Sequence, residues 1–167
     1  MRFTRTLLAM SVALFMALPA QRAEAQLSFG PQLVLWDFSD LGIGARVDFG
    51  LAESFGIEEG FFQGLFGTAN ANYLLQDGDG TSLAFNVNGA VPIQTDGPIS
   101  PYVGAGINHY RFSFSGFGES VSASSSGLNI LGGTFFDLGS IPAFGELQYS
   151  TTGAGFLTLS GGVLFGG

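Results

Sequence analysis

Apolar residues alternate with small or polar residues along most of this chain, from Ile43 to Phe165, in stretches of about ten residues. The last stretch shows the pattern best, because Leu157 and Leu159 fall on one parity and Thr158 falls on the other. A period of two places unlike side chains on opposite faces of a β-strand. We find no convincing amphipathic helix, so the chain is predicted to be all-β.

The first 25 residues have the composition of a secretory signal peptide. Arg2 and Arg5 form its basic start, and residues 7–18 form an apolar core that is too short to cross a bilayer. The sequence Ala23-Glu24-Ala25 has the form that a signal peptidase accepts, so we expect cleavage after Ala25. Strands of membrane-crossing length behind an export signal indicate a transmembrane β-barrel.

Cleavage would leave residues 26–167, which suit a single outer-membrane β-barrel domain. This mature chain has no Lys and no Cys, which excludes a lipoprotein anchor and disulfides. Without Glu24, the mature chain has twelve acidic residues and two cations, Arg46 and Arg111, so its formal charge is −10. This negative charge argues against nucleic-acid binding. Charged residues make up 11% of the chain, below the roughly 25% of soluble domains.

Eight segments qualify as strands of an antiparallel up-and-down barrel. The fifth starts at Tyr102 and loses its alternation after His109. The others are Leu27 to Trp36, Ile43 to Leu51, Leu65 to Leu74, Thr81 to Val91, Leu128 to Leu138, Phe144 to Ser150 and Leu157 to Phe165.

An even number of strands places both barrel termini on the periplasmic side, so every second connection faces outward. The outward loops are expected near Asp37 to Leu41, Gln76 to Gly80, Ser115 to Gly127 and Thr151 to Gly155. The Ser-rich loop from Ser115 to Gly127 is the longest, so it would offer the main surface for an extracellular partner. The segment Ala52 to Gly64 fits a loop, a short helix or a strand extension.

One parity of the strands is polar and is predicted to face the barrel interior. Eight strands leave an interior about wide enough for side chains, which favours a hydrogen-bonded plug over a binding or conduction site. An unpaired buried guanidinium is costly, so Arg46 should pair with Asp48 or Glu146. The inward residues are Arg46, Asp48, Asn70, Asn72, Asn86, Asn88, Asn108, Glu146 and Gln148.

The stretch Ile99-Ser100-Pro101-Tyr102-Val103-Gly104-Ala105-Gly106-Ile107 resembles the strand starts of the small OmpA/OmpX-like outer-membrane barrels of Gram-negative bacteria. The resemblance implies an eight-stranded barrel, often without enzymatic activity, with outer-membrane lipid and the barrel-assembly machinery as partners. In that family the closing strand usually ends on an aromatic residue. Here Phe165 is followed by Gly166 and Gly167, which departs from the pattern.

His109, the single histidine, raises the alternative of a lipid hydrolase or acyltransferase. Some small outer-membrane barrels use a His with a Ser, and Ser113, Ser115 and Glu119 lie near His109 in the sequence. However, His109 shares the outward parity of Ile107, which favours a place in an interfacial girdle. Other aromatic residues expected near the interfaces are Trp36, Tyr102, Tyr110, Phe112, Phe114 and Tyr149.

The stretch Asp77-Gly78-Asp79-Gly80-Thr81 faintly resembles a calcium loop. Its twelfth position is Asn88, where the calcium loop requires Glu, and two Asp-Gly pairs are also typical of a hairpin turn. We therefore predict no metal, cofactor or catalytic residue.

The sequence predicts a monomeric, non-enzymatic outer-membrane protein with a non-conducting interior and a structural or surface-interaction role. Two alternatives remain open. One is a lipid-modifying outer-membrane enzyme that uses His109. The other is a soluble periplasmic lipocalin-like barrel, in which apolar side chains would point inward around a ligand.

Overall fold

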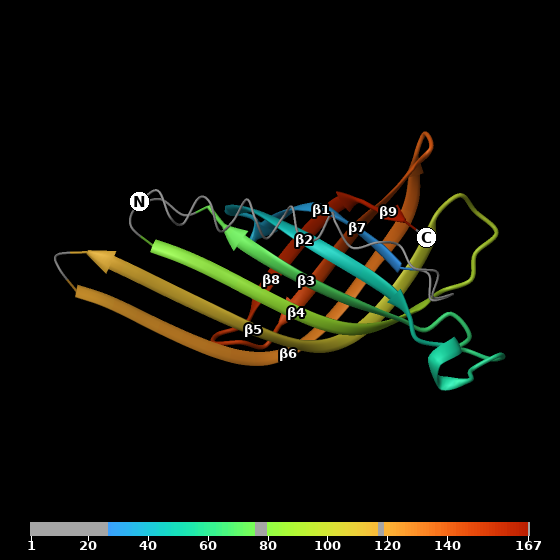
Figure 1. Cartoon of the computed structure of the whole chain (residues 1–167), viewed down its shortest axis with the longest axis horizontal. Helices are drawn as coiled ribbons and strands as arrows, with labels where there is room; N and C mark the ends of the chain where they lie inside the picture. Colours follow the sequence, from blue (N-terminus) through green and yellow to red (C-terminus); the bar gives the residue numbers. More distant parts are fainter. Residues whose placement is uncertain (1–26, 76–79, 117–118, 167) are drawn as a thin grey trace.

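The computed structural model describes residues 27–75, 80–116 and 119–166. The predicted signal peptide and its cleavage site after Ala25 lie outside these residues. The described chain forms nine strands and one short 3-10 helix (Figure 1). The elements are β1 (Leu27–Trp36), β2 (Asp40–Gly50), η1 (Glu53–Phe55), β3 (Phe66–Leu74), β4 (Gly80–Pro92), β5 (Ser100–Gly116), β6 (Glu119–Leu138), β7 (Ile141–Ser150), β8 (Phe156–Val163) and β9 (Phe165–Gly166).

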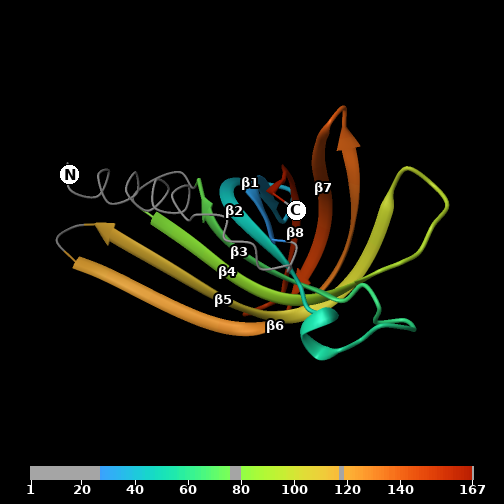
Figure 2. The same cartoon turned by 45° about the vertical axis from the view of Figure 1, so that its right-hand side comes forward.

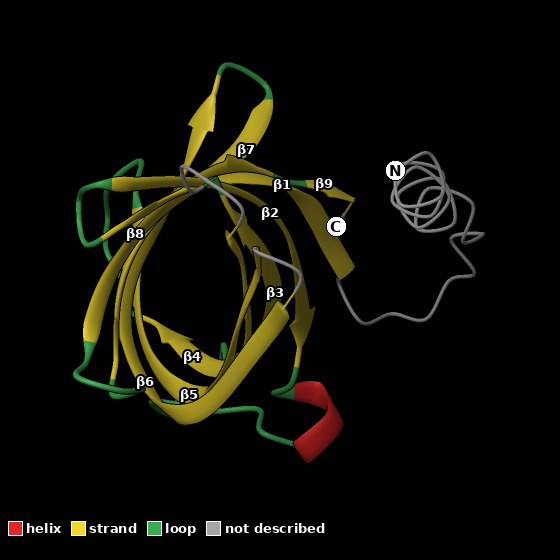
Figure 3. Ribbon diagram, turned by 90° about the vertical axis from the view of Figure 1, so that its left-hand side faces the viewer, coloured by secondary structure: helices red, strands yellow, loops and turns green. Residues whose placement is uncertain are grey.

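The strands close into one antiparallel barrel, which Figure 3 shows along its axis. β1 pairs with β2 on one side and with both β8 and β9 on the other, so β8 and β9 act as one closing strand. Phe29 lies opposite Phe165 and Gln32 lies opposite Gly162, so the register is the same across the interruption. In this register Val163 faces Pro31 and Leu164 faces Gly30, and the ladder lapses there because Pro31 has no N–H to donate. The predicted eight-stranded barrel is thus confirmed.

Most buried side chains in the barrel are polar, although Val34, Leu74 and Phe144 are also buried, and the most exposed strand side chains are apolar. Arg46 on β2 is only 1% exposed, whereas Ile107 on β5 and Leu128 on β6 are 60% and 63% exposed. A lipocalin-like barrel requires the opposite arrangement, so that alternative is wrong. Within the described residues, no helix combines the length and the apolar character needed to cross a membrane.

Several strand limits agree closely with the sequence pattern. β1 has the predicted limits, and the segment from Ala52 to Gly64 is a loop that contains the three-residue helix η1, so the alternative of a strand extension is wrong. The β1–β2 turn places Asp37 and Phe38 at positive φ, which is the geometry of a tight hairpin.

The predicted loop from Ser115 to Gly127 is wrong. β5 continues to Gly116 and β6 begins at Glu119, and these two residues pair with each other. β7 ends at Ser150 opposite Asn129, so residues 119–127 of β6 run past the end of β7. Figures 1 and 2 show β5 and β6 reaching beyond the other strands. We call residues 109–116 and 119–128 the β5–β6 extension.

Candidate functional site

An ion cluster of Arg46, Asp48, Tyr102 and Glu146 crosses the barrel interior. Arg46 Nε donates to Asp48 Oδ1 at 2.7 Å, and Arg46 Nη1 donates to Glu146 Oε2 at 2.8 Å. The Tyr102 hydroxyl donates to the same Glu146 oxygen at 2.9 Å. Arg46 Cζ also lies 4.2 Å from the ring centroid of Phe144. The predicted pairing of Arg46 is confirmed, with both candidate carboxylates.

The strand parities explain how three parts of the chain meet in this cluster. Arg46 and Asp48 share the inward parity of β2, Tyr102 comes from β5, and Glu146 comes from β7 on the other side of the barrel. The expectation that Tyr102 lies at a membrane interface is wrong, because it is 1% exposed and lies inside the barrel. Its parity matches the inward residue Asn108, which is the signal that could have placed it.

A cluster of amides lies beside the ions. Asn129 Nδ2 donates to Asn86 at 3.1 Å and to Asn88 at 2.9 Å, and Ser150 donates to Asn129 Oδ1 at 2.7 Å. Gln148 Nε2 donates to Asn86 at 3.1 Å. The sequence prediction missed Asn129 because the alternation in Leu128 to Leu138 does not show which parity faces inward. Each amide donates to or accepts from another strand, so the cluster ties β4, β6 and β7 together.

A second set of polar contacts extends these amides toward the outer end. Gln32 donates to Asn72 at 2.5 Å, and Asn72 donates to Asn70 at 3.0 Å. Thr152 donates to Asn108. Each residue that was predicted to face inward is buried or half-buried.

Aromatic side chains cover the outer end of these polar layers. The Trp36 ring centroid lies 3.9 Å from that of Phe156, and Tyr110 shares a hydrogen bond of 2.8 Å with Ser82. Trp36 and Tyr110 were expected at a membrane interface, and the structure instead turns them into the barrel mouth. Phe114 and Tyr149 remain about two-fifths exposed.

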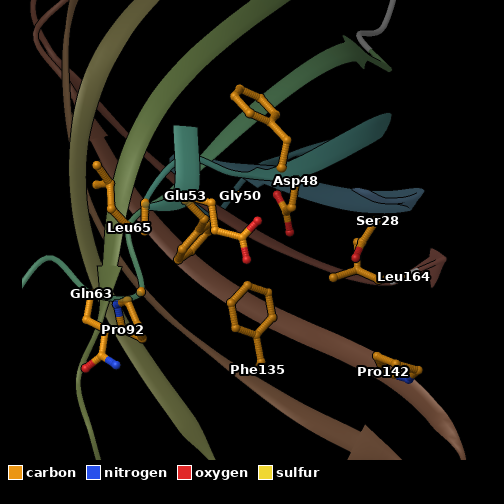
Figure 4. Close-up of a pocket in the computed structure, with 14 residues that line it drawn as sticks. Ser28, Asp48, Gly50, Glu53, Gln63, Leu65, Pro92, Phe135, Pro142 and Leu164 are labelled. Carbon is orange, nitrogen blue, oxygen red and sulfur yellow. The ribbon is translucent and has the colours of Figure 1, made fainter. Parts of the chain in front are cut away.

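A pocket of about 430 Å³ opens at the opposite end of the barrel, next to the ion cluster. Figure 4 shows the carboxylates of Asp48 and Glu53 at this pocket, with Phe135 and Pro142 on other sides of it. Among the described residues, no group of three or more His, Cys, Asp or Glu could hold a metal ion. Residues 77–79 of the calcium-like stretch lie outside the described chain, and Asn88 lies in the amide cluster.

The outward face of the β5–β6 extension carries His109. Its Nδ1 lies 2.9 Å from Ser126 Oγ on β6, a partner that sequence spacing did not suggest. Ser113 lies four residues further along β5, which is about 13 Å, so the structure does not bring it to His109. The side chains of Ser115 and Glu119 are outside what the structure describes.

The edge of β6 that faces away from β5 has no described strand beside it over residues 121–127. Leu128 marks the end of pairing, because its N–H donates to Thr151 Oγ1 and its C=O accepts from the Thr151 N–H, both at 2.9 Å. Alternate residues of a strand direct their backbone groups to the same side. The N–H and C=O of Ser122, Ser124 and Ser126 therefore point toward the side that β7 has left.

Solved structures with the same fold are small outer-membrane barrels. The N-terminal barrel domain of Pseudomonas aeruginosa OprF matches with a TM-score of 0.57 and 13% identity, over 84% of this chain and 99% of the other. Ail, the attachment invasion locus protein of Yersinia pestis, matches with 0.59 and 18%, over 84% and 97%. The outer membrane enzyme PagL matches with 0.51 and 15%, over 83% and 98%.

These likenesses define the fold as that of the small eight-stranded transmembrane barrels of outer membranes. No protein-family model matches the chain, and no curated protein matches it in sequence. One of these fold neighbours, PagL, is an enzyme, whereas OprF and Ail are not named as enzymes.

Proposed function

We propose that this protein resides in the outer membrane and binds an extended segment of an extracellular protein by β-strand addition to the free edge of β6. The observation that carries the proposal is the unpaired edge over residues 121–127. Exposed strand edges are normally protected by Pro, by charged side chains or by bulges. Residues 121–127 contain neither Pro nor a charged residue.

The inner face of the extension supports the same proposal. Phe112 lies opposite Ala123, and Phe114 lies opposite Val121. Val121 is 61% exposed, so this face presents apolar side chains to solvent above the polar interior. A strand added beside β6 would gain main-chain hydrogen bonds along its length and specificity from its alternate side chains. A partner segment that alternates apolar and polar residues would place its apolar side chains on the inner face of the extension and its polar side chains on the Ser-rich outer face.

The interior supports a non-conducting barrel. The ion cluster and the amide cluster join strands on opposite sides of the barrel, and eight strands leave room for little besides side chains. We therefore propose that the barrel serves as a membrane anchor for the extension. Cell fractionation followed by heat-modifiable migration on a denaturing gel tests the membrane location. Recovery in the soluble fraction without detergent would refute it.

Ser124→Pro tests the strand addition. Ser124 directs its N–H to the free edge, so Pro there removes a donor that pairing with β5 does not use. The probe is a fluorescent peptide of alternating Val and Thr with a Lys at each end, and the assay is fluorescence anisotropy. We expect a loss of about fivefold, the worth of one hydrogen bond of about 1 kcal/mol.

Ser124→Thr is the matched control, because it retains the N–H and favours an extended backbone. It should bind the peptide like the native protein. Equal binding by the Pro and Thr variants, or no binding by the native barrel, would contradict the proposal.

A lipid-modifying enzyme is a second candidate function, favoured by the 2.9 Å contact between His109 Nδ1 and Ser126 Oγ. A His that accepts the Ser proton activates the hydroxyl for attack on an ester. Release of fatty acid from phosphatidylcholine, lost in both His109→Ala and Ser126→Ala, would establish it. Absence of release from the native protein in detergent would remove this candidate.

A further inference from the structure

Arg111 is an exposed cation without an ion-pair partner among the described side chains. It is one of only two cations outside the predicted signal peptide. The other, Arg46, is held by Asp48 and Glu146 in the interior.

The residues around Arg111 follow from the strand register. Leu83 lies opposite it on β4 and Ser124 lies opposite it on β6. His109 and Ser113 lie two residues away on β5, on the same outward face. None of these neighbours is acidic, whereas the surrounding serines and His109 supply hydrogen-bonding groups.

The position of Arg111 along the barrel is equally informative. Ile107 and Leu128, which lie opposite each other, form the last row in which both residues on the outer face of β5 and β6 are apolar. The next row pairs His109 with Ser126, and the row after it pairs Arg111 with Ser124. The outer face thus changes from apolar to polar at this level, which is typical of the boundary between hydrocarbon and lipid headgroups.

We propose that His109, Arg111, Ser124 and Ser126, which we call the boundary patch, bind the phosphorylated headgroup of a lipid in the outer leaflet. A guanidinium matches phosphate through two parallel N–H···O bonds. The Ser124 hydroxyl supplies a further donor. The Ser126 hydroxyl can also donate when it accepts a hydrogen bond from His109 Nδ1–H.

A headgroup is favoured over free phosphate because its acyl chains would lie on the apolar rows below the patch. The overall charge of the chain repels anions, so attraction must come from these particular side chains. The strand addition uses main-chain groups at the edge and side chains on the inner face of the extension, whereas the boundary patch uses side chains on its outer face, and Arg111 takes part only in the patch. Arg111→Gln should therefore leave peptide binding unchanged.

The experiment measures how much phosphatidic acid remains bound to the barrel. Native protein is reconstituted in phosphatidylcholine nanodiscs with or without a minority of phosphatidic acid, and retained lipid is determined by mass spectrometry of the intact protein after transfer to detergent. A parallel sample with inorganic phosphate at millimolar concentration tests whether the free anion binds the patch or displaces the lipid. Heat-modifiable gel migration confirms that each variant is folded.

We expect the native protein to retain phosphatidic acid in preference to phosphatidylcholine. Arg111→Gln should lower this preference about fivefold, the contribution of one basic residue near a membrane surface. Arg111→Lys should retain part of this preference, because the Lys ammonium keeps the positive charge but cannot form the two parallel hydrogen bonds of the guanidinium. Free phosphate should neither bind nor displace the lipid.

Asp40→Asn is the matched control for bulk charge, because Asp40 is exposed at the β1–β2 turn of the same barrel end. It should leave the preference unchanged. Equal retention by native protein and Arg111→Gln would overturn the proposal. An increase in Asp40→Asn as large as the loss in Arg111→Gln would also overturn it, because bulk charge would then explain the binding. Displacement by inorganic phosphate would overturn the assignment to a lipid.

Discussion

Replacement of Arg46 by Met should destabilise the barrel by about 3–5 kcal/mol, the cost of removing one partner from a buried ion pair. The Arg46 side chain is 0% exposed, and those of Glu146 and Asp48 are 2% and 10% exposed. Met fills much of the volume of Arg46, but it leaves two carboxylates in the interior without their cation. The loss therefore measures electrostatics more than packing.

The assay is urea unfolding in lipid vesicles, followed by the fluorescence of Trp36, the single tryptophan. Trp36 contacts Phe156, so its environment changes when the barrel opens. The matched control is the triple variant with Arg46→Met, Asp48→Asn and Glu146→Gln, which removes all three charges. It should recover most of the lost stability, since neutral replacement of a whole buried ion group is often tolerated.

A loss of stability below about 0.5 kcal/mol for Arg46→Met would refute the reasoning, because surface substitutions that touch no buried ion pair change stability by only that much. Failure of the triple variant to recover stability would show that the shape of the guanidinium matters rather than its charge. A single variant that does not fold at all leaves the triple variant as the deciding comparison.

Two further predictions concern packing and conduction. Gly30→Ala should destabilise the barrel by about 1–3 kcal/mol, because its Cβ would lie 1.7 Å from the backbone oxygen of Val163. Gly145→Ala, which meets nothing within 4 Å, should be nearly neutral, and equal unfolding midpoints for the two variants would contradict this account. Native protein in a planar bilayer should give no conductance steps, because the ion and amide clusters join opposite walls. Steady single-channel steps from purified protein would show that the interior is open.

The sequence pattern located the strands well because period two is a local property of the backbone. β1 and the inward residues Arg46, Asp48 and Glu146 were predicted from parity alone. The cost of an unpaired buried guanidinium predicted that Asp48 or Glu146 would pair with Arg46. The sequence could not show that both do, since Glu146 meets Arg46 only after the strands close into a barrel.

The β5–β6 extension was missed for a different physical reason. Alternation identifies a strand when one face meets lipid and the other meets a polar interior. Beyond His109 the outer face turns polar and the inner face turns apolar, so the rule that located the other strands fails although the backbone is still extended. The Ser-rich composition of the segment then suggested a loop.

The sequence by itself determined the class of fold, the parity of most strands and the polar character of the interior, because these depend on backbone geometry and on transfer of side chains between lipid and water. Only the tertiary structure decided that Asn129 joins the amide cluster, that Ser126 meets His109 and that no described strand covers the edge of β6 over residues 121–127. Those features depend on strand register and relative strand length, which are set by pairing between segments far apart in the chain.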